Sequence, residues 1–89
     1  MHDATVEGVV EEDGRLLVQV KTLEGKRLTF EFNDVRSVRM NHPEGMVLYS
    51  LSEMKESPPY RHFVFTNWDE EDDSYLEVTA REVTSSMQQ

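Results

Sequence analysis

Residues 4–32 read ATVEGVVEEDGRLLVQVKTLEGKRLTFEF, and this stretch decides the fold class. Apolar and polar residues alternate in three successive runs, and the first two runs each end at an acidic residue followed by glycine. Alternation with a period of two is typical of a β-strand that buries one face. Glycine accepts the positive φ angles that tight hairpin loops require. The stretch therefore predicts three antiparallel strands joined by two hairpins.

The register of the first hairpin follows from the face that each side chain must occupy. A two-residue loop at Asp13 and Gly14 would place Glu7 opposite Val20, with a carboxylate on the apolar face. A shift of one residue moves every side chain of a strand to the other face. We therefore expect a three-residue loop over residues 12–14. This loop gives the pairs Val6–Val20, Gly8–Val18 and Val10–Leu16.

The second hairpin follows the same logic, with a three-residue loop over residues 23–25. It predicts the pairs Leu16–Phe32, Val18–Phe30 and Val20–Leu28. The three strands then share one continuous apolar face. Beyond residue 33 the alternation breaks, and the spacing of Val35 and Val38 fits either a bend or a single helical turn before a short strand through Met40.

The second half of the chain predicts further strands. Residues 41–45 form a loop by composition, and residues 46–54 fit a strand or one helix face, of which we favour the strand. Residues 60–67 and 75–83 are predicted strands, with Phe63 and Phe65 in the core of the first. Leu76, Val78 and Ala80 face inward from the second. The polar residues 84–89 are expected to fray as a tail.

These elements predict a mostly β protein with a single domain over residues 1–83. We expect about six antiparallel strands in a meander, curled into an open barrel or a small sandwich. The sequence leaves open whether the sheet closes.

Composition excludes several classes of function. The 89 residues include no cysteine, which rules out disulfides, zinc–thiolate sites and thiol chemistry. The net charge of −9 argues against nucleic-acid binding, and no apolar run reaches the roughly 20 residues of a membrane helix. With no signal peptide visible, we expect a cytoplasmic protein without a membrane partner. Residues 41–89 carry three basic and ten acidic side chains, so a basic partner or a cation would be drawn to this half.

The acidic run between the last two predicted strands is the most unusual local feature. The candidate partner-binding residues are Trp68, Asp69, Glu70, Glu71, Asp72, Asp73 and Tyr75. An EF-hand loop is excluded, because Ser74 stands where glycine is required and Ala80 stands where a bidentate glutamate is required. Three interpretations remain: a solvated hairpin tip whose like charges discourage aggregation, a surface for a basic partner, or a weak cation site.

Trp68 has two interpretations. It either caps the core at the end of the strand that contains Phe63 and Phe65, or it anchors a partner beside the carboxylates. Tyr60 and Tyr75 flank the same hairpin and are expected to join such a surface.

The sequence does not indicate an enzyme. No serine lies in a G-x-S-x-G context, and neither a P-loop nor a G-x-G-x-x-G motif is present. His2 and Asp3 form an adjacent pair like that of metal-dependent phosphohydrolases, but the further histidines and aspartates of that chemistry are missing. His42 and His62 are expected at the surface or its rim. We therefore predict no catalytic residue, no cofactor and no metal.

The order of short motifs resembles a group of known proteins. The early His2-Asp3-Ala4, the β meander, the Phe30-x-Phe32-x-x-Val35 segment and the closing residues 76–80 resemble small β-rich bacterial domains of unknown function. Some of those domains are grouped with immunity proteins of contact-dependent and polymorphic toxin systems. The resemblance implies a bacterial, non-enzymatic protein and carries over no binding residue.

Three hypotheses follow. The first is a protein-interaction module that binds a basic protein through residues 68–75, and the resemblance implies that it is of the immunity type. The second is a binder of a small ligand or cation at the mouth of the curled sheet. The third is a self-associating structural domain in which edge strands pair to form a homodimer.

Overall fold

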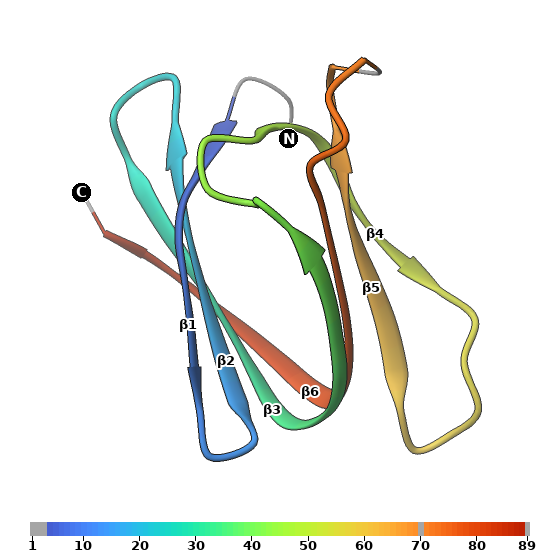
Figure 1. Cartoon of the computed structure of the whole chain (residues 1–89). Coiled ribbons are helices and arrows are strands. Elements are labelled where there is room, and N and C mark those ends of the chain that lie inside the picture. The colour runs from blue at the N-terminus through green and yellow to red at the C-terminus, as the bar shows by residue number, and fades with distance from the viewer. Residues whose placement is uncertain (1–3, 70, 89) are drawn as a thin grey trace.

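The chain forms six antiparallel strands in a computed structural model that describes residues 4–69 and 71–88 (Figure 1). The strands are β1 (Ala4–Glu12), β2 (Arg15–Thr22), β3 (Arg27–Asn41), β4 (Val47–Met54), β5 (Arg61–Asn67) and β6 (Tyr75–Gln88). The predicted mostly β, antiparallel class is confirmed. The described residues contain no helix long and apolar enough to cross a membrane.

The strands close into a barrel with the order β1-β2-β3-β6-β5-β4. Two three-stranded meanders, β1–β2–β3 and β4–β5–β6, are joined because the long strands β3 and β6 pair with each other through a bend (Figure 1). Closure on the other side is short, since β1 and β4 share only the pairs Ala4–Leu48 and Thr5–Val47. Two backbone hydrogen bonds extend it, from Val6 N–H to Met46 O (2.9 Å) and from Gly45 N–H to Val6 O (2.7 Å).

The first hairpin corrects the predicted loop. Glu12 pairs with Arg15, so the loop has two residues, Asp13 and Gly14, with φ angles of 38° and 77°. Positive φ at both positions is the type I′ geometry that suits the twist of a hairpin. Val9, not Gly8, then lies opposite Val18, and the predicted Val10–Leu16 pair is replaced by Val10–Leu17.

A β-bulge restores the apolar face farther along β1. The register shifts between Val6 and Gly8, which leaves Glu7 without a partner on β2 and places Val6 opposite Val20. A bulge inserts one extra residue in one strand and so reverses the parity beyond it. The predicted Val6–Val20 pair is therefore confirmed, although the loop that led to it was wrong.

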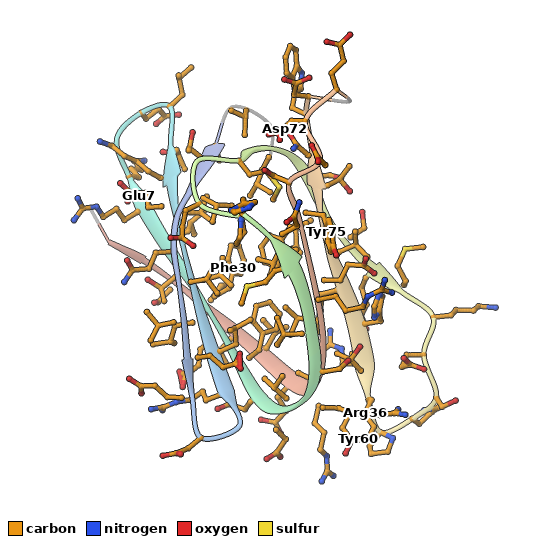
Figure 2. The ribbon with its side chains drawn as sticks, in the orientation of Figure 1. Glu7, Phe30, Arg36, Tyr60, Asp72 and Tyr75 are labelled. Carbon is orange, nitrogen blue, oxygen red and sulfur yellow. The ribbon has the colours of Figure 1, made fainter. Side chains whose placement is uncertain are left out.

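The second hairpin has the predicted register. The pairs Leu16–Phe32, Val18–Phe30 and Val20–Leu28 are all present. Phe30 points into the barrel (Figure 2), and Phe32 is fully buried. Both meet the phenylalanines of β5, with the ring of Phe32 5.2 Å from Phe63 and the ring of Phe30 5.9 Å from Phe65. These contacts connect the two meanders in a single core.

The break predicted after residue 33 is a bend within β3, and the alternative of a helical turn is wrong. Asp34 has a φ of 53°, and the register against β6 shifts between Val35 and Ser37. Val35 N–H donates to Gly14 O at 2.8 Å, so the turn of the first hairpin is tied to this corner. The predicted loop 41–45 is shifted by one residue, since Asn41 still belongs to β3 and residues 42–46 connect to β4. The predicted strand over residues 46–54 is confirmed as Val47–Met54.

The predicted fraying of residues 84–89 is wrong for residues 84–88. These residues extend β6 and pair with β3 from Glu31–Thr84 to Arg27–Gln88. The first half of β3 offers a free edge on the side away from β2, and its backbone groups bind this polar segment regardless of side-chain hydrophobicity. The His2–Asp3 pair, Glu70 and Gln89 lie outside the described residues.

Candidate functional site

The acidic run forms the loop between β5 and β6 at one end of the barrel (Figure 1). Two bonds attach this loop to neighbouring elements. Trp68 N–H donates to Val47 O at the start of β4 (2.8 Å), and Asn41 Nδ2 at the end of β3 donates to Asp73 O (3.1 Å). The loop is therefore held by two strand ends besides its own, the end of β3 and the start of β4.

Short polar side chains fix the shape of the loop from within. Asn67 Oδ1 accepts from Asp69 N–H (2.9 Å), and Asp69 Oδ1 accepts from Glu71 N–H (3.0 Å). Asp72 Oδ1 accepts from both Ser74 N–H (3.1 Å) and the Ser74 hydroxyl (3.0 Å). Such bonds to the backbone two residues ahead stabilise turns in place of backbone pairing. The loop is consequently ordered without a hydrophobic core of its own.

These hydrogen bonds also favour the charged form of one carboxylate. The Asn67 side chain, followed by the Ser74 N–H and hydroxyl, lowers the pKa of Asp72 below its ordinary value. Donors that bind the ionised carboxylate stabilise it relative to the protonated acid. Asp72 therefore keeps its negative charge at neutral pH while it organises the turn.

Trp68 does not cap the core, and this prediction is wrong. The side chain is 62% exposed, whereas Phe63 and Phe65 are buried on the inner face of β5. Strand parity explains the difference, because Trp68 lies an odd number of residues from both phenylalanines. Met46 and Leu48 from the β4 side fill the interior at this end instead.

Two further exposed apolar side chains belong to the same end of the barrel as Trp68. Val47, whose carbonyl accepts the Trp68 N–H, is 38% exposed, and Tyr75 at the start of β6 is 40% exposed. Tyr75 faces outward because its neighbour Leu76, opposite Phe65, faces the core. We call Val47, Trp68 and Tyr75 the Trp68 patch. Figure 2 shows Tyr75 at the same end of the molecule as Asp72.

Tyr60 does not join this patch. It precedes β5, whereas Trp68 follows that strand, so the two side chains lie at opposite ends of the barrel. Figure 2 shows Tyr60 beside Arg36, whose guanidinium carbon lies 5.3 Å from the centre of the tyrosine ring. This cation–π contact braces the bend of β3 against the β4–β5 loop.

The carboxylates of the acidic loop differ from six of the twelve other carboxylates that the structure describes. Glu7, Glu12, Glu24, Glu31, Glu53 and Glu77 each lie in a salt bridge. Within residues 4–69 and 71–88, no salt bridge involves Asp69, Glu71, Asp72 or Asp73, and all four are exposed. Their negative charge is thus not neutralised by a cation of the described chain. Glu70 belongs to the same run but lies outside the described residues, so its part in partner binding stays a prediction.

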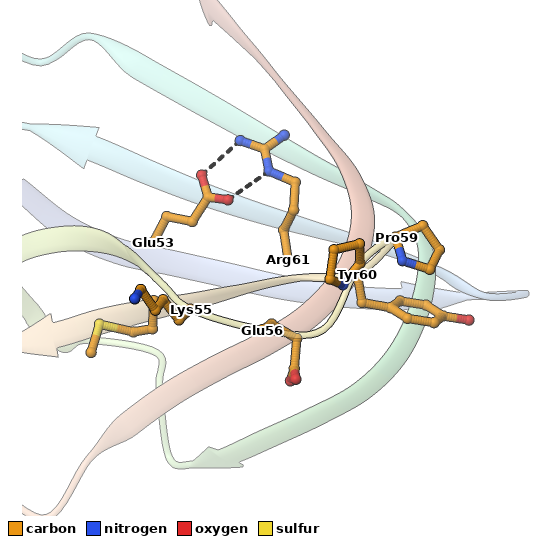
Figure 3. A pocket seen from close by; sticks show the side chains of 8 residues that line it. Glu53, Lys55, Glu56, Pro59, Tyr60 and Arg61 are labelled. Carbon is orange, nitrogen blue, oxygen red and sulfur yellow. Dashed lines mark hydrogen bonds and ion pairs between the residues drawn. The ribbon is translucent and has the colours of Figure 1, made fainter.

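A hollow of about 510 Å³ lies under the β4–β5 loop, at the end of the barrel away from the acidic loop (Figure 3). Glu53 and Arg61 line one side of this hollow. Two hydrogen bonds of 2.8 and 2.7 Å join their side chains. Arg61 lowers the pKa of Glu53, and Glu53 raises that of Arg61. Both groups are satisfied by each other, so the hollow offers no free charge from this pair to a ligand.

A groove of about 250 Å³ lies between the first hairpin and the second half of β3. Val35, Val38 and Met40 form its apolar side, and Glu11, Arg15 and Arg36 supply charge. The predicted ligand site at the mouth of the sheet stays a prediction. Across the described residues no three His, Asp or Glu side chains are grouped to hold a metal ion.

His62 is partly buried, which fits the rim position expected as an alternative to the open surface. Its Nδ1 lies 2.9 Å from Thr79 Oγ1, and its Nε2 lies 3.0 Å from Glu77 Oε1. A hydroxyl, an imidazole and a carboxylate in a row are the components of a nucleophilic triad. Thr79 is only 5% exposed, however, so its hydroxyl is not open to a substrate. The cross-strand pair His62–Thr79 could not be found without the β5–β6 register.

Known proteins do not identify this site. No family model matches the chain, and no curated protein or solved structure matches it. Its function is therefore inferred from the exposure, charge and hydrogen bonding of its own residues.

Proposed function

We propose that this protein is a non-enzymatic interaction module that binds a basic protein partner through the Trp68 patch and the acidic β5–β6 loop. The observation that carries the proposal is the 62% exposure of Trp68 on a loop ordered by hydrogen bonds. A tryptophan that has a buried position within reach normally occupies it, since its transfer from water is strongly favourable. Trp68 instead remains available to a second molecule.

The loop is arranged so that binding would lose little conformational entropy. Its backbone is already fixed by the bonds of Asn67, Asp69 and Asp72. Ordering a loop or its side chains on binding normally reduces affinity, and a preorganised surface avoids most of that loss. Trp68 and Tyr75 are also residue types that dominate the energetics of protein interfaces.

Charge selects the class of partner. The exposed carboxylates around Trp68 are free of internal cations, so lysine or arginine side chains of a partner can neutralise them. A negative surface of this kind accelerates association with a positive partner and repels nucleic acid. The resemblance of the sequence to immunity-type proteins of polymorphic toxin systems stays a prediction.

The proposal is tested by titrating an oligolysine peptide while recording the fluorescence of Trp68, the single tryptophan of the chain. The loop variant combines Asp69→Asn, Glu71→Gln and Asp73→Asn, which keep the Asp69 Oδ1 acceptor and leave Asp72 intact. Each exposed ion pair contributes up to about 1 kcal/mol, so we expect affinity to fall by about tenfold or more.

A matched control separates the loop from the overall charge. Glu11→Gln, Asp13→Asn and Glu56→Gln remove the same number of exposed carboxylates from other turns and strand ends. We expect this variant to bind within about twofold of the unmodified protein, because salt screens charges more than about 10 Å away. Equal weakening in both variants, or binding without a change in Trp68 fluorescence, would refute the proposed site.

A further inference from the structure

The closed barrel leaves several strand segments with one unpaired edge. Among the described residues, no strand pairs with the second edge of β1 after Val6, of β3 after Val35, of β4 after Leu48 or of β6 after Ala80. An unpaired edge presents N–H and C=O groups that can add a strand from another chain. Natural proteins block such edges with charges, bulges or prolines.

Three of the four edges carry such blocks. The free part of β1 begins at the bulge of Glu7 and ends at Glu11 and Glu12. The second half of β3 has a register shift and two arginines, Arg36 and Arg39. The register of β4 shifts between Leu48 and Ser50. Each of these devices interferes with the regular hydrogen-bond ladder that a further strand requires.

The edge of β6 has no register shift, and its charges are confined to its first two residues. Residues 81–88 read REVTSSMQ, and only the first two are charged. Their register with β3 is continuous from Val35–Ala80 to Arg27–Gln88. The segment contains no proline, and its valine and threonine favour an extended strand. In a chain with a net charge of −9, six consecutive uncharged residues on a regular open edge are an exception.

We propose that this edge of β6 pairs with the same edge of a second copy of the chain. Antiparallel pairing of identical strands has two-fold symmetry and closes as a dimer. Centred on Ser85, it places Glu82 opposite Gln88 of the second copy, and no like charges face each other. The sheet β1-β2-β3-β6 would then continue into its symmetry mate as eight strands.

The occupant is a second copy because the edge has no net charge, with Arg81 and Glu82 cancelling, and two copies can pair without opposing like charges. A partner selected by electrostatics would meet its complement at the acidic loop, at the opposite end of β6 from the C-terminal residues (Figure 1). One strand pair buries less surface than a stable interface of about 1,200 Å². A weak, concentration-dependent dimer therefore follows.

Sedimentation equilibrium over about 10 μM to about 1 mM tests the proposal, with a dimer expected to appear at the upper end. The variants Ser85→Lys and Ser85→Asp each place like charges at the two-fold axis. Like charges directly opposite each other destabilise strand pairs, and we expect each variant to dimerise about fivefold more weakly. An equimolar mixture of the two variants should recover association, because opposite charges then meet. Ser52→Lys and Ser52→Asp on the edge of β4 are the matched controls and should leave dimerisation unchanged.

Hydrogen exchange of the unmodified protein locates the interface without a mutation. Amides within residues 82–88 should exchange more slowly as the concentration rises, and those of the acidic loop should not. A species of 10.4 kDa at every concentration would overturn the proposal and leave the edge to a strand of another protein. Stronger dimerisation of Ser85→Lys with weaker dimerisation of Ser85→Asp would also overturn it, because the effect would then follow net charge.

Discussion

Deletion of Glu7 should leave the fold intact, although it removes a residue from the middle of a core strand. Glu7 is the extra residue of the β1 bulge and has no partner on β2. Without it, Val6 still lies opposite Val20, Gly8 opposite Gln19 and Val9 opposite Val18, now in a regular ladder. The alternation of inner and outer faces is preserved on both sides of the deleted position.

The expected magnitude follows from what Glu7 contacts. Its one ion pair, with Arg27 at 3.4 Å, is exposed and contributes about 1 kcal/mol or less. Deletion of Gln19 from β2 is the contrasting case, because no bulge is available there. It turns the fully buried Val20 outward and Lys21 inward. The loss of valine burial alone is at least about 1.5 kcal/mol, and an unpaired inward lysine adds several more.

Urea unfolding followed by circular dichroism provides the measurement. A domain of this length has a free energy of unfolding of about 4 to 13 kcal/mol, so deletion of Gln19 should abolish or nearly abolish cooperative unfolding. Deletion of Glu7 should change the free energy of unfolding by about 1 kcal/mol or less, and Glu7→Gln measures the ion-pair part separately. Comparable losses for the two deletions would show that the bulge does not set the parity of β1.

Phe32→Ala should lower the free energy of unfolding by about 3 to 5 kcal/mol in urea titrations, because Phe32 is fully buried between Phe63 and Phe65; a loss below about 1 kcal/mol would contradict this packing. Trp68→Ala should change stability by about 1 kcal/mol or less, and acrylamide should quench native Trp68 almost as well as in the unfolded chain; strong protection from quenching would restore the core-cap interpretation. Because hydrogen bonds lower the folded-state pKa of Glu53 and Asp72, their stabilisation is present above the ordinary carboxyl pKa and is lost as pH falls through the lowered values. The melting temperature should therefore fall on acidification below about pH 4, and the decrease should be smaller in the double variant Glu53→Gln, Asp72→Asn; an unchanged acid profile in that variant would contradict the assignment.

Side-chain parity predicted the all-β class and the register of the second hairpin. In both cases the argument depends only on which residues are apolar and on the period of a strand. The Val18–Phe30 and Leu16–Phe32 pairs follow because no irregularity interrupts β2 or the first half of β3. Where a strand is regular, hydrophobic alternation is sufficient to fix its partner.

The first hairpin shows where that argument stops. For Val6 and Val20 to share the inner face, the register must shift by one residue somewhere between them. Either a longer loop or a bulge supplies this shift. Asp13-Gly14 favours the two-residue type I′ turn by its local chemistry, and the structure satisfies both demands by moving the shift to Glu7. A sequence of alternating residues does not state at which position such a shift falls.

The C-terminal segment was mispredicted for a different reason. Residues 84–88 carry no apolar periodicity, so nothing local distinguishes them from a solvated tail. Their pairing depends on β3. Strand β2 pairs with one edge of β3, and the other edge stays open for residues 84–88. Backbone hydrogen bonds can recruit a polar strand to such an edge, and this property belongs to the topology and not to the segment itself.

The candidate site depends on the same topology. Composition marked the residues from Trp68 to Tyr75, but their arrangement comes from bonds to segments distant in the chain, at Val47 and Asn41. Those two positions flank the β3–β4 loop, whose Gly45 and Met46 also close the barrel against Val6. The position of Trp68 thus depends on the region where the barrel closes. There β1 and β4 share only two strand pairs. The loop thus takes its local shape from its own hydrogen bonds and its position from segments distant in the chain.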